Sequence, residues 1–168
     1  MNIKFGLVGC GRISTNHFDA ISKTENAKIT ACSDIILSRA KEAAEKFNVK
    51  SVYKNYKEML DKEELDAVLI CTPSGLHPQM GIEAAKRKIN VVSEKPMAID
   101  LKSADALVKA CDDNDVQLFV VKQNRQNPAI QMLKKAIDKN RFGRLFSANA
   151  TVRWTRPQNY YDMASWRG

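Results

Sequence analysis

The feature that most constrains the fold is an alternation of short apolar runs with helical patterns. Runs rich in Val, Ile and Leu predict strands near residues 3–8, 29–32, 52–53, 67–71, 90–93 and 117–121. Helical patterns lie between them, near residues 15–22, 37–47, 56–60, 78–87 and 101–112. Repeated strand–helix–strand units pair their strands in parallel through right-handed crossovers. Residues 1–121 are therefore predicted to form one doubly wound parallel α/β sheet.

The last part of the chain has a different pattern. Residues 122–128 are polar and turn-like, and residues 129–137 have a helical pattern that Gly143 is expected to stop. Residues 145–154 alternate like a strand with one exposed face. One helix and one strand cannot bury a core by themselves. Residues 122–168 are thus expected to begin an α+β domain that is incomplete here.

Composition excludes several classes of protein. The longest apolar run, residues 67–71, is far shorter than the roughly 20 residues of a membrane helix, and the start lacks a signal-peptide pattern, so we expect a cytoplasmic protein with no membrane partner. The net charge of +8 is spread along helices without a basic motif, which favours a solvated face or an anionic small ligand over nucleic acid. The cysteines form no CxxC pair, so neither a metal site nor a disulfide framework is expected.

The first strand leads into a glycine-rich turn, Gly9-Cys10-Gly11-Arg12-Ile13-Ser14, which is a GxGxxG pattern with Ser14 in the third glycine position. Gly9 would permit a tight turn, and Gly11 would let the backbone approach a diphosphate. The following helix would direct its N-terminal N–H groups, near Arg12 and Ile13, toward that anion. Glycines in turns are common, but this turn follows a strand and opens a helix, which favours dinucleotide binding.

Asp34 ends the second predicted strand, about 20 residues beyond the turn, where a ribose-binding carboxylate is expected. An acid here accepts hydrogen bonds from ribose hydroxyls and repels a 2′-phosphate, so NAD is predicted over NADP. Arg39 at the start of the next helix could favour a phosphate instead, although we interpret it as an ordinary exposed helix residue.

The fourth and fifth strands end in polar segments at the carboxyl edge of the sheet, where ligands of open α/β folds bind. The first is Thr72-Pro73-Ser74-Gly75-Leu76-His77, whose hydroxyls could meet a cofactor. His77 could be catalytic, or could equally cap or pack a helix. His17, in the first helix, is interpreted as structural.

The second polar segment is Glu94-Lys95-Pro96. Lys95 would face a cleft holding a positively charged nicotinamide, where a lysine of lowered pKa is a useful proton-transfer group. The alternative is an ion pair of Glu94 at the surface with a solvated Lys95. The residues alone leave the two interpretations even.

Taken together, the glycine turn, Asp34, the sequence CTPSGLH and the sequence EKP, in this order, resemble the glucose-fructose oxidoreductase, inositol dehydrogenase and rhizopine catabolism (Gfo/Idh/MocA) family of sugar oxidoreductases. The resemblance implies a Rossmann domain that binds NAD, followed by an α+β domain that commonly makes an oligomer interface. It implies that Lys95 contacts the hydroxyl being oxidised and that Pro96 follows a cis peptide bond. The cofactor would contact Gly9, Gly11, Arg12, Ile13, Asp34, Thr72, Pro73, Ser74, His77, Glu94 and Lys95.

The sequences VKQNRQNP and RWTRPQNYYDMASWRG are similar to family members that oxidise nucleotide-activated amino sugars, or their uronates, at C3. This similarity implies that Gln123, Trp166 and Arg167 lie near the cofactor. Lys95, Asn124 and Arg125 would border the substrate. Arginine suits a diphosphate or a carboxylate, so Arg125, Arg153 and Arg156 are candidates for anion recognition, Arg125 above all.

The expected function is thus that of an NAD-dependent oxidoreductase acting on a sugar hydroxyl, as a homo-oligomer when full length. The alternatives are an unactivated sugar or polyol such as inositol as substrate, or a noncatalytic dinucleotide-binding or sensor module. The resemblance places the partner acid or base, a histidine, in the second domain beyond residue 168. The 168-residue chain is therefore expected to bind the cofactor but to turn over poorly or not at all.

Overall fold

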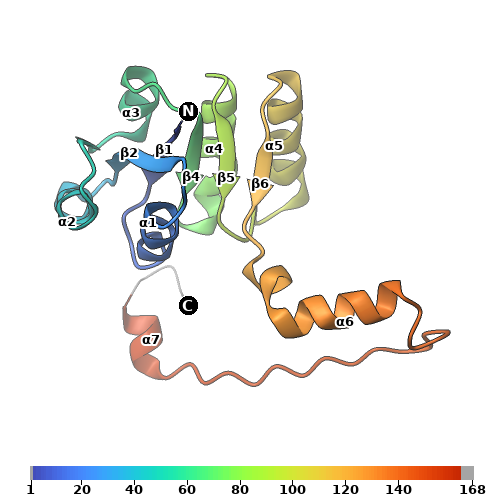
Figure 1. Ribbon diagram of the computed structural model, residues 1–168. Coiled ribbons are helices and arrows are strands. Elements are labelled where there is room, and N and C mark those ends of the chain that lie inside the picture. The colour runs from blue at the N-terminus through green and yellow to red at the C-terminus, as the bar shows by residue number, and fades with distance from the viewer. Residues whose placement is uncertain (1, 164–168) are drawn as a thin grey trace. The chain divides into compact units, whose positions relative to one another are not determined.

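The computed structural model describes residues 2–163, and the chain divides into two compact units, Met1–Val121 and Lys122–Gly168. The first unit is a single sheet with helices on both faces (Figure 1). Its strands are β1 (Ile3–Val8), β2 (Ala27–Ser33), β3 (Ser51–Tyr53), β4 (Ala67–Ile70), β5 (Asn90–Ser93) and β6 (Leu118–Val120). Its helices are α1 (Ser14–Ser22), α2 (Leu37–Phe47), α3 (Tyr56–Lys62), η1 (Ser74–Leu76, a 3₁₀ turn), α4 (His77–Ala85) and α5 (Leu101–Asp113).

The six strands are all parallel and lie in the order β3-β2-β1-β4-β5-β6. The doubly wound Rossmann sheet predicted from the alternating pattern is therefore confirmed. The chain reverses its direction of winding between β1 and β4, and this switch point opens a crevice at the carboxyl ends of the strands. The segments after β1, β2, β4 and β5 all end at that edge.

The core consists of one hydrophobic cluster on each face of the sheet. On one face, Phe18 of α1 and Ala40 of α2 form a cluster with Leu7 of β1. On the other face, Met59 of α3 and Leu107 of α5 belong to the second cluster. Strand β4 is buried along its whole length because both of its faces are covered. This burial explains why its sequence, AVLI, is continuously apolar rather than alternating.

In the first unit, two helix N-termini are fixed by side-chain caps. The Asp100 carboxylate accepts a hydrogen bond from the Ser103 N–H at 2.8 Å, as expected of an N-cap at the start of α5. Asn55 does the same for α3 through the Lys57 N–H, at 2.9 Å.

The second unit contains η2 (Gln123–Gln126), α6 (Pro128–Asp138) and α7 (Gln158–Asp162). The prediction of a strand over residues 145–154 was wrong, since this segment has no regular structure. A strand requires a partner for its backbone groups, and the described part of this unit contains none. The predicted helix stop at Gly143 was also misplaced: α6 ends at Asp138, Asn140 takes the left-handed conformation (φ 52°), and Gly143 (φ 62°) follows in a second turn.

Among the described residues, no helix is both long and apolar enough to cross a membrane.

Candidate cofactor and catalytic site

The glycine turn after β1 has the geometry that a close approach to a ligand requires. Gly9 has φ +92°, and a Cβ there would lie 2.9 Å from the Cys71 backbone, so only glycine fits. A Cβ on Gly11 would meet no protein atom within 4 Å, so this position faces open space. A side chain on Gly11 would fill the space through which a diphosphate reaches the start of α1. The turn therefore fits a dinucleotide cofactor.

Ser14, in the third glycine position of the motif, is buried at the first residue of α1. Its hydroxyl donates a hydrogen bond to the Gly11 carbonyl, and its N–H lies 3.2 Å from the same oxygen. The serine thus satisfies a carbonyl of the turn.

Asp34 follows β2 and is only 8% exposed. One carboxylate oxygen accepts the Cys10 N–H at 2.8 Å, and the other accepts the Ile36 N–H at 2.8 Å. Each oxygen keeps a further lone pair, with which it could accept a hydrogen bond from a ribose hydroxyl. Asp34 therefore joins the loop after β2 to the glycine turn, in addition to its expected contact with the cofactor.

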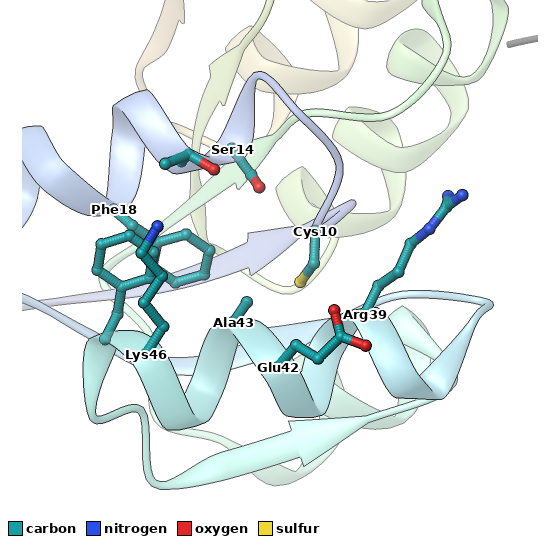
Figure 2. Close-up of a pocket in the computed structure, with 9 residues that line it drawn as sticks. Cys10, Ser14, Phe18, Arg39, Glu42, Ala43 and Lys46 are labelled. Carbon is teal, nitrogen blue, oxygen red and sulfur yellow. The ribbon is translucent and has the colours of Figure 1, made fainter. Parts of the chain in front are cut away.

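A cavity of about 170 Å³ lies beside the glycine turn, between α1 and α2. Figure 2 shows Cys10 and Ser14 on its upper side, with Glu42, Lys46 and the exposed Arg39 along α2. Hydrogen bonding to Cys32, together with burial, raises the pKa of the Cys10 thiol. The cavity includes none of the residues at the ends of β4 and β5, so it is separate from the expected reaction centre.

The segment after β4 forms a short loop held by one histidine. Thr72 and Ser74 are half-buried, whereas Pro73 is exposed. The His77 side chain is 1% exposed, with Nε2 lying 2.7 Å from the Thr72 carbonyl oxygen and Nδ1 lying 2.8 Å from the Pro96 carbonyl oxygen. Both ring nitrogens thus face backbone oxygens, so His77 joins the loop after β4 to the loop after β5. Its expected contact with the cofactor stays a prediction.

The Glu94-Lys95-Pro96 turn follows β5 at the same edge, and its Lys95–Pro96 peptide bond is cis, as the resemblance implied. Glu94 is 7% exposed, and its N–H bonds the Ile70 carbonyl of the neighbouring strand at 3.0 Å. Lys95 is exposed at the end of this buried strand. A lysine in that position can reach a ligand in the crevice.

Comparison with known proteins identifies the family. Residues 3–122 match the model for GFO_IDH_MocA, described as an oxidoreductase family with an NAD-binding Rossmann fold. The chain belongs to the Gfo/Idh/MocA oxidoreductase family.

Two solved structures are similar over the whole chain. The WlbA dehydrogenase from Bordetella pertussis, in complex with NADH and UDP-GlcNAcA, is 46% identical with a TM-score of 0.96, over 100% of this chain and 51% of that one. The WlbA dehydrogenase from Chromobacterium violaceum, with the same two ligands, is 44% identical with a TM-score of 0.96, over 99% of this chain and 48% of that one.

Among Gfo/Idh/MocA proteins of known sequence, the myo-inositol 2-dehydrogenase of Thermotoga maritima is 30% identical over 155 residues, which are 92% of this chain and 46% of that protein. The chain therefore spans about half the length of these relatives.

The remaining predicted site residues lie in the second unit. Gln123, Asn124 and Arg125 form η2 and are exposed, and the Arg125 N–H bonds the Lys122 carbonyl at 2.9 Å. The Arg156 guanidinium lies 4.8 Å from the Trp154 ring centre and 4.9 Å from that of Tyr160. Arg153 is also exposed. Trp166 and Arg167 lie outside the described residues. The cofactor and substrate contacts expected of these side chains stay predictions.

Sequence reasoning missed the contact between α1 and the end of β5 in this Gfo/Idh/MocA site. His17 of α1, which we interpreted only as structural, lies with its Nε2 atom 2.7 Å from Oε1 of Glu94. These residues are 77 positions apart. The sequence contained one signal of this contact. His17 is a polar residue three positions after Ser14, on the side of α1 that otherwise faces the core. Among the described residues, no cluster of side chains suited to a metal ion is present.

Proposed function

We propose that the chain binds NAD(H) and is the nucleotide-binding part of a dehydrogenase that oxidises a hydroxyl, at C3, of a nucleotide-activated amino sugar or its uronate. The observation that carries this proposal is the 46% identity, over the entire chain, to a WlbA dehydrogenase in complex with NADH and UDP-GlcNAcA. The open approach to Gly11 and the carboxylate of Asp34 support the cofactor part. The exposed Lys95 supports the catalytic part.

Gly11 and Asp34 would hold NAD, which would supply the acceptor for the hydride of the sugar carbon. Lys95 would donate a hydrogen bond to the substrate hydroxyl and assist the departure of its proton. Arg125 and Arg156 would interact with the diphosphate or the carboxylate of the substrate. A histidine in the remainder of a longer protein would be the partner acid or base, as the family resemblance implies.

The cofactor part is tested by calorimetric titration of the chain with NAD and NADP. We expect NAD to bind more tightly, and Asp34→Asn to reduce that preference by about tenfold or more, equivalent to about 1.4 kcal/mol. Asn keeps an acceptor oxygen for one of the two backbone N–H groups that bond to Asp34, and it removes the charge that repels a 2′-phosphate. Asp105→Asn, an exposed change of the same charge on α5, is the control. Equal affinities in the unsubstituted chain would contradict the role of Asp34.

A second candidate is the oxidation of an unactivated polyol, which the 30% identity to an inositol dehydrogenase favours. NADH formation by a longer polypeptide that includes the second domain, with UDP-GlcNAcA and with myo-inositol, separates the two candidates. Loss of activity with Lys95→Met would support the lysine's role, because positioned acid–base groups typically contribute about 10²–10⁴-fold. Cofactor binding without oxidation of any sugar would favour the noncatalytic alternative.

A further inference from the structure

The carboxylate of Glu94 is held at both oxygens. Oε1 lies 2.7 Å from Nε2 of His17, and Oε2 accepts the N–H of Lys95 at 3.1 Å. The side chains of His17 and Glu94 are 16% and 9% exposed. Burial alone would raise the pKa of Glu94. The hydrogen bonds from His17 and from the Lys95 N–H outweigh this effect and hold that pKa below its ordinary value. The ionised carboxylate thus fixes the backbone at the N–H of Lys95.

The backbone is also held on the other side of Lys95. The Pro96 carbonyl oxygen lies 2.8 Å from Nδ1 of His77, whose other nitrogen lies 2.7 Å from the Thr72 carbonyl. The His77 ring is 1% exposed, so its position is fixed by the packing around it. Thr72 lies two residues after β4 and directly follows the buried Cys71, so this ring ties the turn after β5 to the centre of the sheet.

Lys95 itself is exposed, and among the described residues its Nζ makes no hydrogen bond or ion pair that would orient it. Its placement therefore depends on its backbone, which lies between a residue held by one histidine and a residue held by the other. We propose that His17 and His77 are positioning residues for Lys95, holding the Glu94-Lys95-Pro96 turn from α1 and from α4. This inference rests on the proposed function, in which Lys95 meets the substrate hydroxyl beside the nicotinamide.

The physical argument concerns precision. A flexible side chain attached to a fixed backbone searches a small volume, whereas attachment to a mobile turn enlarges that volume. Displacement of a catalytic group by about 1 Å can reduce a rate by about 10²-fold. Residues that never touch the substrate can therefore control the reaction through the backbone of the one that does.

The two histidines allow matched substitutions. Gln places its amide nitrogen near the position of Nε2 of histidine, and Asn places it near the position of Nδ1. His17→Gln keeps a donor for Glu94, whereas His17→Leu removes it. His77→Asn places a donor near the Pro96 carbonyl, whereas His77→Gln places a donor near the Thr72 carbonyl only. If the two histidines position Lys95, its behaviour in His17→Gln and His77→Asn should be close to that in the unsubstituted chain. Its behaviour in His17→Leu and His77→Gln should differ more.

The first measurement is hydrogen exchange of the Lys95 amide in the chain without cofactor. We expect His17→Leu and His77→Gln to accelerate this exchange by about tenfold, and the two matched variants to accelerate it much less. Melting temperatures identify any variant that is unfolded, and the half-buried His17 site supplies the decisive pair if both His77 variants fail to fold. Unchanged exchange in a folded His17→Leu variant would overturn the inference.

The second measurement is NMR of carbon-labelled lysine, with the Lys95 signal identified by its loss in Lys95→Arg and the exposed Lys102 as an internal control. NAD should shift the Lys95 signal more than ADP-ribose, which lacks the nicotinamide. In His17→Leu and His77→Gln the NAD-induced shift should fall by at least about half. In His17→Leu, which is outside the expected cofactor contacts, the ADP-ribose affinity should stay within about twofold. Equal Lys95 shifts in all variants would overturn the positioning role and leave cofactor binding intact.

Altered amide exchange in a chain that binds neither ligand would instead contradict the proposed function and support the turn contacts.

Discussion

At the scale of single residues, the two glycines of the turn differ in what surrounds them. A Cβ at Gly9 would collide with the backbone of Cys71, and its φ of +92° disfavours any side chain. A Cβ at Gly11 would contact nothing in the protein. Gly9 is therefore required by the fold, whereas no contact within the protein requires glycine at position 11.

This contrast predicts different outcomes for the same substitution. Gly11→Ala should leave the melting temperature of the chain nearly unchanged and strongly weaken NAD binding. Gly9→Ala should reduce the free energy of unfolding by about 1–3 kcal/mol, because it combines backbone strain with a steric clash. Thermal unfolding and calorimetric titration of both variants test this. A Gly11→Ala variant that binds NAD normally would show that no ligand approaches this position.

Glu94 predicts a pH dependence of stability. The folded state lowers its pKa, so the ionised carboxylate stabilises the fold above the ordinary pKa of glutamate, and this stabilisation is lost as the pH falls through the lowered value. At about pH 7, Glu94→Gln should reduce the free energy of unfolding by about 1.5–3 kcal/mol, and the difference from the unsubstituted chain should shrink in acid. Melting temperatures from neutral to acid pH measure this. Glu45→Gln, an exposed change on α2, should show no such trend.

At the scale of elements, α4 and α5 pack closely because Gly81 lacks a side chain. A Cβ at Gly81 would lie 2.6 Å from Cδ1 of Leu107, so the leucine occupies the space that the glycine leaves. Leu107 is fully buried, whereas Leu101 at the start of α5 is 82% exposed. The same residue type therefore has opposite roles on one helix.

We expect Leu107→Ala to reduce the free energy of unfolding by about 2–5 kcal/mol, because it removes buried methyl groups and leaves a cavity. Leu101→Ala on the same helix should change it by no more than about 0.5 kcal/mol. Denaturant unfolding monitored by circular dichroism measures both. Equal effects would mean that α5 does not pack on α4 in solution as described.

The elements also show what the sequence could and could not predict. Continuous apolar runs such as AVLI of β4, and the helical patterns between such runs, were sufficient to place strands and helices, because burial and helical periodicity are local signals. The prediction of a strand at residues 145–154 was wrong because alternating apolar and polar residues indicate that one face of a strand could be buried. The alternation does not indicate that a partner strand is present. The contacts of His17 and His77 could not be predicted, since they depend on which loops meet at the sheet edge.

At the scale of the whole molecule, all of the hydrophobic core lies in the first unit. Both core clusters consist of residues from Phe5 to Leu118, and no described side chain after Val121 is buried. The family model matches nearly the same range, residues 3–122. The free energy that maintains the fold therefore comes from this range.

A polypeptide ending at Val121 should fold cooperatively, with a melting temperature within about 4–8 °C of that of the chain, which corresponds to a loss of no more than about 1 kcal/mol. Its far-ultraviolet circular dichroism should retain the α/β signature. Titration with NAD then shows how much Gln123 and the later predicted residues contribute to affinity. A polypeptide that is unfolded or aggregated would mean that the later residues are needed for stability.

Helix α1 begins at the glycine turn with Ser14 and, one helical turn later, contacts the end of β5 through His17. In chimeras that replace the first strand, turn and helix by those of another dinucleotide-binding protein, the graft would therefore bring its own residue against Glu94. Exchanges intended to alter cofactor choice alone would also change the support beneath Lys95, unless the residue equivalent to His17 is kept. The part of this protein that can be exchanged without altering the proposed reaction centre is thus smaller than the strand–helix unit that its topology outlines.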